Sequence, residues 1–217
     1  MVATKLIAAA LIGFTFTASA LADSPTVRIT SADQAKAVAL LLRRTDIGAG
    51  WQGGQVATTP LSSPNCPGFD PKESDLTVTG HADAIYKFPP LGVEVDQDVQ
   101  VLSSAAAVET DFKRSISPKL GQCLAYQLDH VTHVTSATVE RVQFPPIGDV
   151  SAVYRAYIHA RTGGQVATVL SDYVFFGEGR VEYELTVSAP MTTQDQLQRF
   201  ELELAQIVLH RASAGPS

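Results

Sequence analysis

The chain has 217 residues, of which 45% are hydrophobic and 18% are charged, and its formal net charge at pH 7 is −6. This size and composition are typical of one globular domain with a substantial core, and they exclude a disordered chain. Because the chain is acidic and has no basic run, it is a poor candidate for binding nucleic acid or anionic membranes.

The first 22 residues have the pattern of a secretory signal peptide. Lys5 precedes the short apolar run of residues 6–16, and Ala20 and Ala22 occupy the two recognition positions of a signal peptidase site. The run is too short to be a comfortable membrane span, and no second long apolar stretch follows. We therefore expect residues 1–22 to be removed and the rest to be secreted or to stay with the cell envelope. The alternative is an uncleaved signal that acts as an anchor.

Residues 23–211 are expected to form one domain and residues 212–217 a flexible tail. Ser31 is expected to cap the first helix, because Gln34 follows it at the spacing of a capping box. Residues 52–75 hold four prolines and a glycine pair, a composition that predicts a long loop.

Six segments are expected to form strands, most of them from alternating apolar and polar residues, with residues 134–144 the less regular one. They are residues 76–88, 93–101, 134–144, 150–158, 166–176 and 180–188. Glycine turns join the last three, which is typical of an antiparallel meander. Helical spacing predicts further helices over residues 104–116, from Pro118, and from Thr193 onward. The expected fold is therefore α+β, with an antiparallel sheet of about six strands packed against three to four helices.

The chain has two cysteines, Cys66 in the proline-rich loop and Cys123 in an expected helix. Export would permit a disulfide between them, which would pin the loop to the helix. A reactive thiol pair is the alternative, but the chain has no C-x-x-C motif to support a redox enzyme. We expect the disulfide.

No common catalytic or cofactor motif is present. The chain lacks G-x-S-x-G, the phosphate-binding G-x-x-x-x-G-K-[ST] and the dinucleotide-binding G-x-G-x-x-G. His130 and His133 are the closest pair of histidines, but no third metal ligand lies near them in the sequence. We expect no cofactor, no metal site and no enzymatic activity.

Two pairs of carboxylates offer the main route to catalysis. Strand alternation places Asp96 with Asp98, and Glu182 with Glu184, on one face of a strand, about 7 Å apart at Cα. An exported hydrolase could use such carboxylates. A solvated sheet face explains them more simply, and we favour that interpretation.

Three aromatic residues are the candidate ligand contacts. Trp51 is the only tryptophan and lies among glycines, where its indole could line a cleft instead of only covering the end of the core. Tyr86 and Tyr154 occupy the inward positions of their strands and are weaker candidates.

Two stretches resemble a known family. Residues 37–51 read AVALLLRRTDIGAGW, and residues 103–112 read SSAAAVETDF and lead to a helical Cys123. They resemble the PknH-like extracellular sensor domain of actinobacterial receptor kinases, which also occurs in secreted proteins and lipoproteins. The resemblance covers most of residues 31–211. It implies a sheet flanked by helices, a disulfide, and a central cleft for an unknown ligand.

The functional expectation is an exported, non-catalytic ligand-binding or sensor-like domain of the cell envelope. Its ligand would be a small molecule or an envelope component, and another envelope protein is a further candidate partner. The alternatives are an exported hydrolase that uses surface carboxylates and an envelope protein-interaction module.

Overall fold

The computed structural model describes residues 23–61, 66–162, 164–191 and 194–214. The expected signal peptide lies outside these ranges, as do Thr193, the expected start of the last helix, and the last three residues of the expected tail. No helix of the described part is long and apolar enough to cross a membrane.

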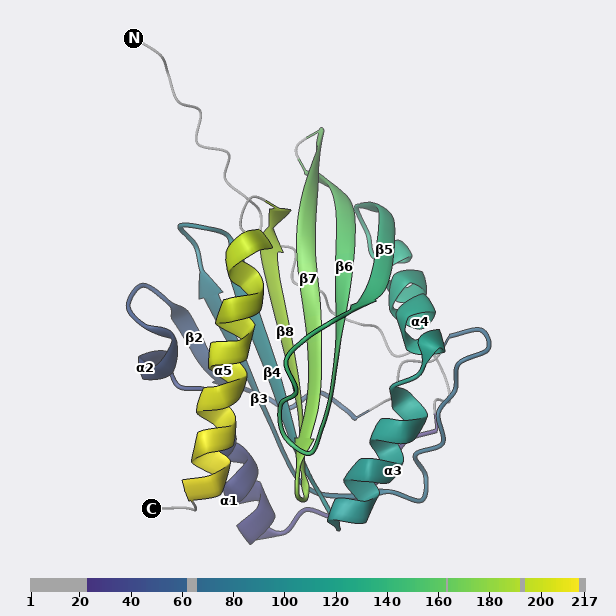
Figure 1. Ribbon diagram of the computed structural model, residues 1–217, viewed down its shortest axis with the longest axis vertical. Helices are drawn as coiled ribbons and strands as arrows, with labels where there is room; N and C mark the ends of the chain where they lie inside the picture. The colour runs from purple at the N-terminus through teal and green to yellow at the C-terminus, as the bar shows by residue number, and fades with distance from the viewer. Residues whose placement is uncertain (1–22, 62–65, 163, 192–193, 215–217) are drawn as a thin grey trace.

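The fold is mixed α+β, built on one eight-stranded sheet (Figure 1). The strands are β1 (Thr26–Val27), β2 (Gln52–Val56), β3 (Thr77–Phe88), β4 (Val93–Leu102), β5 (Val134–Val142), β6 (Val150–Thr162), β7 (Gln165–Glu178) and β8 (Val181–Pro190). Their order is β1-β3-β4-β8-β7-β6-β5, and β2 also pairs with β3. All pairs are antiparallel except the short pair of β1 with β3. All six expected strands are present.

The two additional strands lie at the β3 edge of the sheet. β2 occupies the start of the segment that the sequence predicted as a loop. Its Gly53 has a φ of 117°, and a Cβ at this position would collide with the carbonyl of Ile85 on β3. The glycine that suggested a loop therefore permits a close approach between two strands.

The helices are α1 (Ser31–Leu40), α2 (Arg44–Ile47), α3 (Ala105–Ser115), α4 (Pro118–Asp129) and α5 (Gln194–Ala214). Thr30, and not Ser31, caps α1, because its Oγ1 accepts the backbone N–H of Asp33 at 3.1 Å. Gln34 lies outside any capping box, and its side chain bonds to the backbone of His81 instead. α5 continues to Ala214, past the expected helix end at residue 211.

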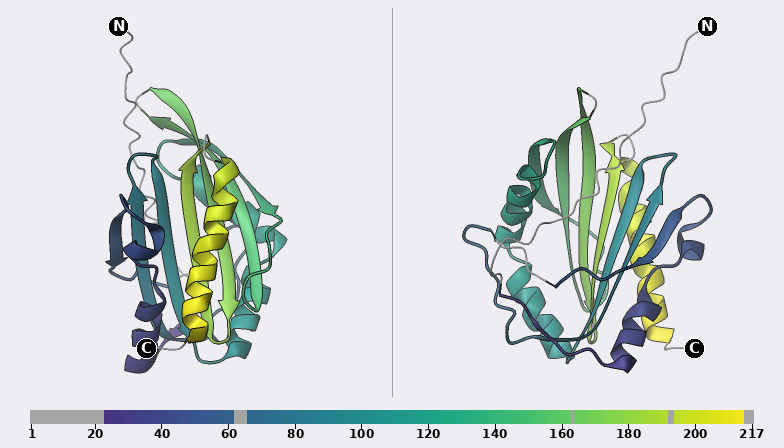
Figure 2. Two further views of the ribbon diagram at one scale, coloured as in Figure 1. Left: turned by 60° about the vertical axis from the view of Figure 1, so that its left-hand side comes forward. Right: turned by 180° about the vertical axis from the view of Figure 1, so that it is seen from behind.

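Both faces of the sheet are covered (Figure 2). We call the side under α1 and α5 the α5 face; its core includes Val99, Val174 and Leu185. We call the opposite side the α4 face; Tyr154, Ala156 and Ile158 of β6 pack there with α4. Alternation along β6 and β7 supplies apolar side chains to both faces in turn, whereas β3, β4 and β8 present mostly polar side chains to the α4 face.

The expected disulfide is present. Cys66 and Cys123 are bonded, with their Cα atoms 5.4 Å apart. The bond ties the chain between β2 and β3 to α4. We call this chain, residues 57–61 and 66–75, the crossing segment, because it runs across the α4 face from β2 toward α4 (Figure 2).

Candidate functional site

A row of three carboxylates crosses three adjacent strands on the α4 face. Asp83 of β3 lies directly opposite Asp98 of β4, and Asp98 lies directly opposite Glu184 of β8. Side chains in such positions have Cβ atoms roughly 4.5–5.5 Å apart, and like charges placed there are destabilising. The sheet therefore places three carboxylates in neighbouring cross-strand positions, where pairs of opposite charge would stabilise it better.

Further titratable residues flank this row on the same face. We call the whole group the acidic region; it comprises His81, Asp83, Asp96, Asp98, Glu182 and Glu184. Its members come from β3, β4 and β8, next to the apolar half of the face that α4 covers. Among the described residues, no lysine or arginine forms an ion pair with any of these carboxylates.

The acidic region is partly buried, so the expectation of a solvated sheet face is wrong. His81 and Asp83 are each only 6% exposed, and the other four are half-buried. The crossing segment causes part of this burial, because Thr59 donates its backbone N–H (2.7 Å) and its hydroxyl (3.1 Å) to Asp83 Oδ2. α3 also packs against β4 and β8 beside these residues.

Several contacts hold the crossing segment in place besides the disulfide. Arg114 of α3 binds both oxygens of Asp75, at 2.6 and 3.1 Å, and donates to the backbone carbonyl of Lys72 at 2.8 Å. Lys119 of α4 donates to the carbonyl of Gly68 at 2.9 Å. The cover over the acidic region is thus fixed to α3, α4 and β3.

His81 lies between two carboxylates. Its Nε2 is 2.6 Å from Asp98 Oδ2 and 3.0 Å from Asp83 Oδ1. Gln34 of α1 fixes the backbone of His81 by accepting its N–H and donating to its carbonyl. One ring N–H can point at only one carboxylate oxygen, and Asp83 Oδ1 is buried without a hydrogen-bond donor.

Burial and crowding shift the pKa values of this region. Burial alone would lower the pKa of His81, but Asp83 and Asp98 outweigh it and raise this pKa to about 9. Burial raises the pKa of Asp96 to about 7 and, together with the charge of Asp98, that of Glu184 to about 8. Near neutral pH the region therefore retains protons that a bound cation would displace.

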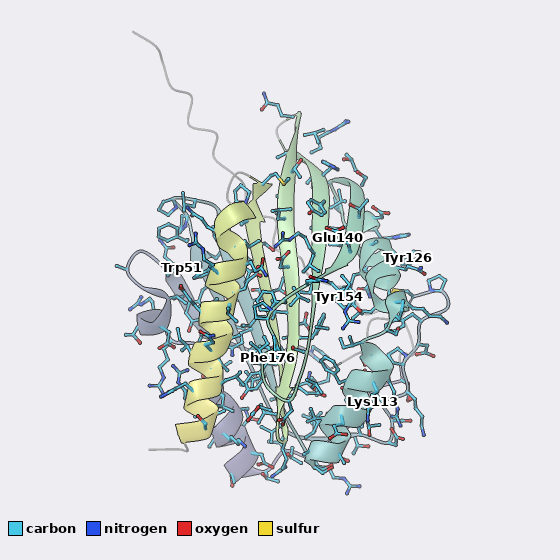
Figure 3. The ribbon with its side chains drawn as sticks, viewed as in Figure 1. Trp51, Lys113, Tyr126, Glu140, Tyr154 and Phe176 are labelled. Atoms are coloured by element: carbon cyan, nitrogen blue, oxygen red, sulfur yellow. A yellow bond between two sulfur atoms is a disulfide. The ribbon has the colours of Figure 1, made fainter. Side chains whose placement is uncertain are left out.

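Trp51 and Tyr154 lie on different parts of the molecule (Figure 3), whereas Tyr86 shares the α5-face core with Trp51. Trp51 packs between Phe88 and Phe200 in the α5-face core, with ring centroids 5.4 and 5.7 Å away. It also borders an open hollow of about 460 Å³ lined by Arg44, Thr45 and residues 48–51. A ligand at Trp51 stays a prediction.

The two tyrosines are buried and already bonded. Tyr86 is 2% exposed on the α5 face and donates its hydroxyl to the carbonyl of Leu42 at 2.5 Å. Tyr154 is 2% exposed on the α4 face and donates its hydroxyl to the carbonyl of Ser117 at 3.0 Å. The structure therefore does not bring Tyr86 and Tyr154 together, because they face opposite sides of the sheet.

The histidine pair weighed as a metal site does not converge with a third ligand in the described residues. His130 Nδ1 lies 2.7 Å from the carbonyl oxygen of Tyr126, and His133 has a φ of 76° at the turn before β5. The described side chains that do converge are those of His81, Asp83 and Asp98. Sequence analysis did not group them, although the hairpin register could have: pairing Phe88 with Val93 places Asp83 opposite Asp98.

Comparison with known proteins gives a structural likeness. No family model and no curated protein matches the chain. The chain is similar to the extracellular domain of PknH from Mycobacterium tuberculosis, with a TM-score of 0.47 and 12% sequence identity, over 82% of this chain and 96% of that chain.

Proposed function

We propose that the chain is an exported, non-catalytic binding domain of the cell envelope, and that its ligand is cationic and binds at the acidic region. The row of Asp83, Asp98 and Glu184 carries this proposal. Opposed, partly buried carboxylates reduce the stability of the free protein, and a bound cation would relieve that repulsion. A sensor-like domain needs such a difference in energy between its free and bound states.

The disulfide supports export. Bonds such as Cys66–Cys123 form and persist in oxidising compartments and are rare in the cytosol. Together with the expected signal peptide, the disulfide supports a protein that works outside the cytoplasm.

An exported hydrolase is the second candidate, since one observation favours it. Asp96 and Glu184 have pKa values near 7 and 8, in the range that suits a general acid at neutral pH. The Thr186 hydroxyl donates to Glu184 Oε1 at 3.4 Å, which is longer than the contact between an activated nucleophile and its base, so we prefer the binding function. A hydrolase screen on the wild-type protein decides between the two, because turnover lost in Asp96→Asn or Glu184→Gln would overturn the non-catalytic proposal.

Thermal denaturation with cationic probes tests the binding function. Spermine, a short oligolysine peptide and divalent metal chlorides should each be assayed against the wild type, with neutral glucose as the reference. We expect at least one cation to raise the melting temperature, and Glu184→Gln to weaken that effect. Glu109→Gln is the matched control, since Glu109 lies exposed on α3 and pairs only with Lys113. The proposal is overturned if no cation stabilises the wild type, or if both variants respond as the wild type does.

A further inference from the structure

We propose that His81, Asp83 and Asp98 bind one divalent first-row transition-metal ion, through His81 Nε2, Asp83 Oδ1 and Asp98 Oδ2. This inference rests on the proposed function, because it names the class of cation that the acidic region takes. The three donor atoms lie within 4.8 Å of one another and come from two paired strands, which form a rigid support.

The spacing of the donors fits a metal. Two ligands at right angles, each roughly 2.1 Å from a metal ion, lie about 3 Å apart. His81 Nε2 lies 3.0 Å from Asp83 Oδ1 and 2.6 Å from Asp98 Oδ2, so only a small opening of the second distance is needed. An imidazole nitrogen with two carboxylate oxygens suits Zn²⁺ and Mn²⁺ better than Ca²⁺ or Mg²⁺, which prefer oxygen ligands alone.

One of the three metal-donor atoms, Asp83 Oδ1, is buried and accepts no hydrogen bond. The side chain of Asp83 is 9% exposed, and its Oδ1 accepts no hydrogen bond although it points at His81 Nε2. A proton on Nε2 serves the nearer Asp98 Oδ2 and leaves Asp83 Oδ1 unsatisfied, which is unfavourable for a buried oxygen. A metal ion in place of that proton would satisfy both carboxylates at once.

The carboxylate oxygens that would not touch the metal accept hydrogen bonds from neighbouring residues. Asp83 Oδ2 accepts two hydrogen bonds from Thr59, and Asp98 Oδ1 accepts one from Gln100 at 3.1 Å. Gln34 holds the backbone of His81. The two carboxylates are thus each oriented by a second contact, as ligands in metal sites usually are.

The site also has an entrance. The side chain of Asp98 is 26% exposed, whereas those of His81 and Asp83 are almost closed off. A metal ion could therefore enter beside Asp98, and water could complete its coordination from that side. Glu184, directly opposite Asp98, adds negative charge next to this entrance.

Equilibrium dialysis with elemental analysis tests the site on the exported chain, freed of any affinity tag and of metal by EDTA. The probes are Zn²⁺, Mn²⁺, Ca²⁺ and Mg²⁺. We expect one Zn²⁺ or Mn²⁺ ion per chain. Since the loss of an outer contact alone weakens metal sites about 10- to 100-fold, His81→Ala and Asp98→Asn should weaken binding by at least about tenfold. His159→Ala is the matched control, because His159 is an exposed strand histidine on the same sheet.

A measurement on the wild type covers variants that fail to fold. In ¹⁵N-histidine NMR spectra, Zn²⁺ should shift the ring nitrogens of His81 and leave those of His159 in place. The inference is overturned if no metal binds, if Ca²⁺ and Mg²⁺ bind as tightly as Zn²⁺, or if His81→Ala binds as the wild type does. If spermine or oligolysine still stabilises the wild type but not Glu184→Gln, only the metal inference fails. If no cation of any kind binds, both proposals fail.

Discussion

Buried carboxylates occur on both faces of the same sheet, but their hydrogen-bond partners differ between the two faces. On the α5 face, Asp172 is fully buried and accepts three hydrogen bonds from Arg155 at 2.5–3.1 Å. On the α4 face, Asp83 and Asp98 share the single ring nitrogen of His81. A guanidinium presents several donors and satisfies a carboxylate completely, whereas one imidazole nitrogen cannot satisfy two. Only the second arrangement leaves an oxygen of its own carboxylates, Asp83 Oδ1, without a donor.

The largest expected effect on stability follows from breaking the ion pair between Arg155 and Asp172 on the α5 face. Arg155→Met should lower the free energy of unfolding by about 3–5 kcal/mol, because Asp172 then stays buried without its partner. Urea denaturation measures this change. Arg161→Met on the same strand is the control, since Arg161 is exposed and should have little effect. Equal losses in both variants would contradict a structural role for the Arg155–Asp172 pair, while cation binding at the acidic region should survive in both.

The disulfide should have the next largest effect, and it acts on the α4 face. Replacing both cysteines by alanine should lower the free energy of unfolding by about 2–4 kcal/mol, because the unfolded chain regains the freedom that the bond removes. It should also weaken cation binding, since the crossing segment loses its tie to α4. Denaturation and the thermal assay with cations measure the two effects. A variant that keeps full cation affinity would show that Thr59 needs no such support.

A third prediction concerns Glu201 of α5, which is fully buried next to Asp172. Burial and the charge of Asp172 raise its pKa to about 9, from 4.5 in an unfolded chain. Its contribution to stability is therefore undiminished below pH 4.5, and it falls as the pH rises toward 9, because only the unfolded state then ionises freely. Glu201→Gln keeps the neutral form, so it should match the wild type near pH 4.5 and exceed it by about 2 kcal/mol at pH 6.

Denaturation at several pH values checks this prediction. Glu203→Gln, two residues away and exposed, should follow the wild type throughout. If Glu201→Gln also follows the wild type at pH 6, the buried carboxyl titrates normally, and the α5 face is more tolerant of charge than the comparison implies.

The smallest expected effect is on the fluorescence of Trp51 when a cation binds. Trp51 packs with Phe88 and Phe200 in the α5-face core, whereas the acidic region lies on the other face. Cation binding should therefore leave the fluorescence of Trp51 almost unchanged. A large change on adding a cation would favour the hollow beside Trp51 as the binding site. Repeating the titration with Glu184→Gln separates the two, because that variant should lose only binding at the acidic region.

The sequence predicts the regular part of the fold well, and the reason is local. Alternation of apolar and polar residues marked long strands such as β4 and β8 most clearly, because these bury every second side chain. β1 and β2 escaped notice because two residues show no period, and because Gly53 and Gly54 read as loop residues. Their pairing with β3 depends on a close approach that only the folded sheet reveals.

The candidate site was harder to predict, because it depends on which face of the sheet each side chain occupies and on residues that are far away in the sequence. Alternation correctly placed Asp96 with Asp98 on one face, but it did not predict that this face is covered, by α3 against β4 and by Thr59 against Asp83, 24 residues away in sequence. Tyr86 and Tyr154 both occupy inward positions, yet they lie on opposite faces, because both faces of this sheet are covered. An inward position on one strand therefore need not match an inward position on another.

Through the disulfide of the crossing segment, the acidic region depends on the redox state of the compartment that holds the chain. In a reducing compartment Cys66 and Cys123 would remain thiols, and the cover over His81 and Asp83 would rely on hydrogen bonds such as those from Thr59. A newly made chain could form the sheet there, but it would lack the covalent link that fixes the cover. If the chain is exported as proposed, oxidation after export would complete the proposed site, and a chain kept in the cytoplasm would lack this link.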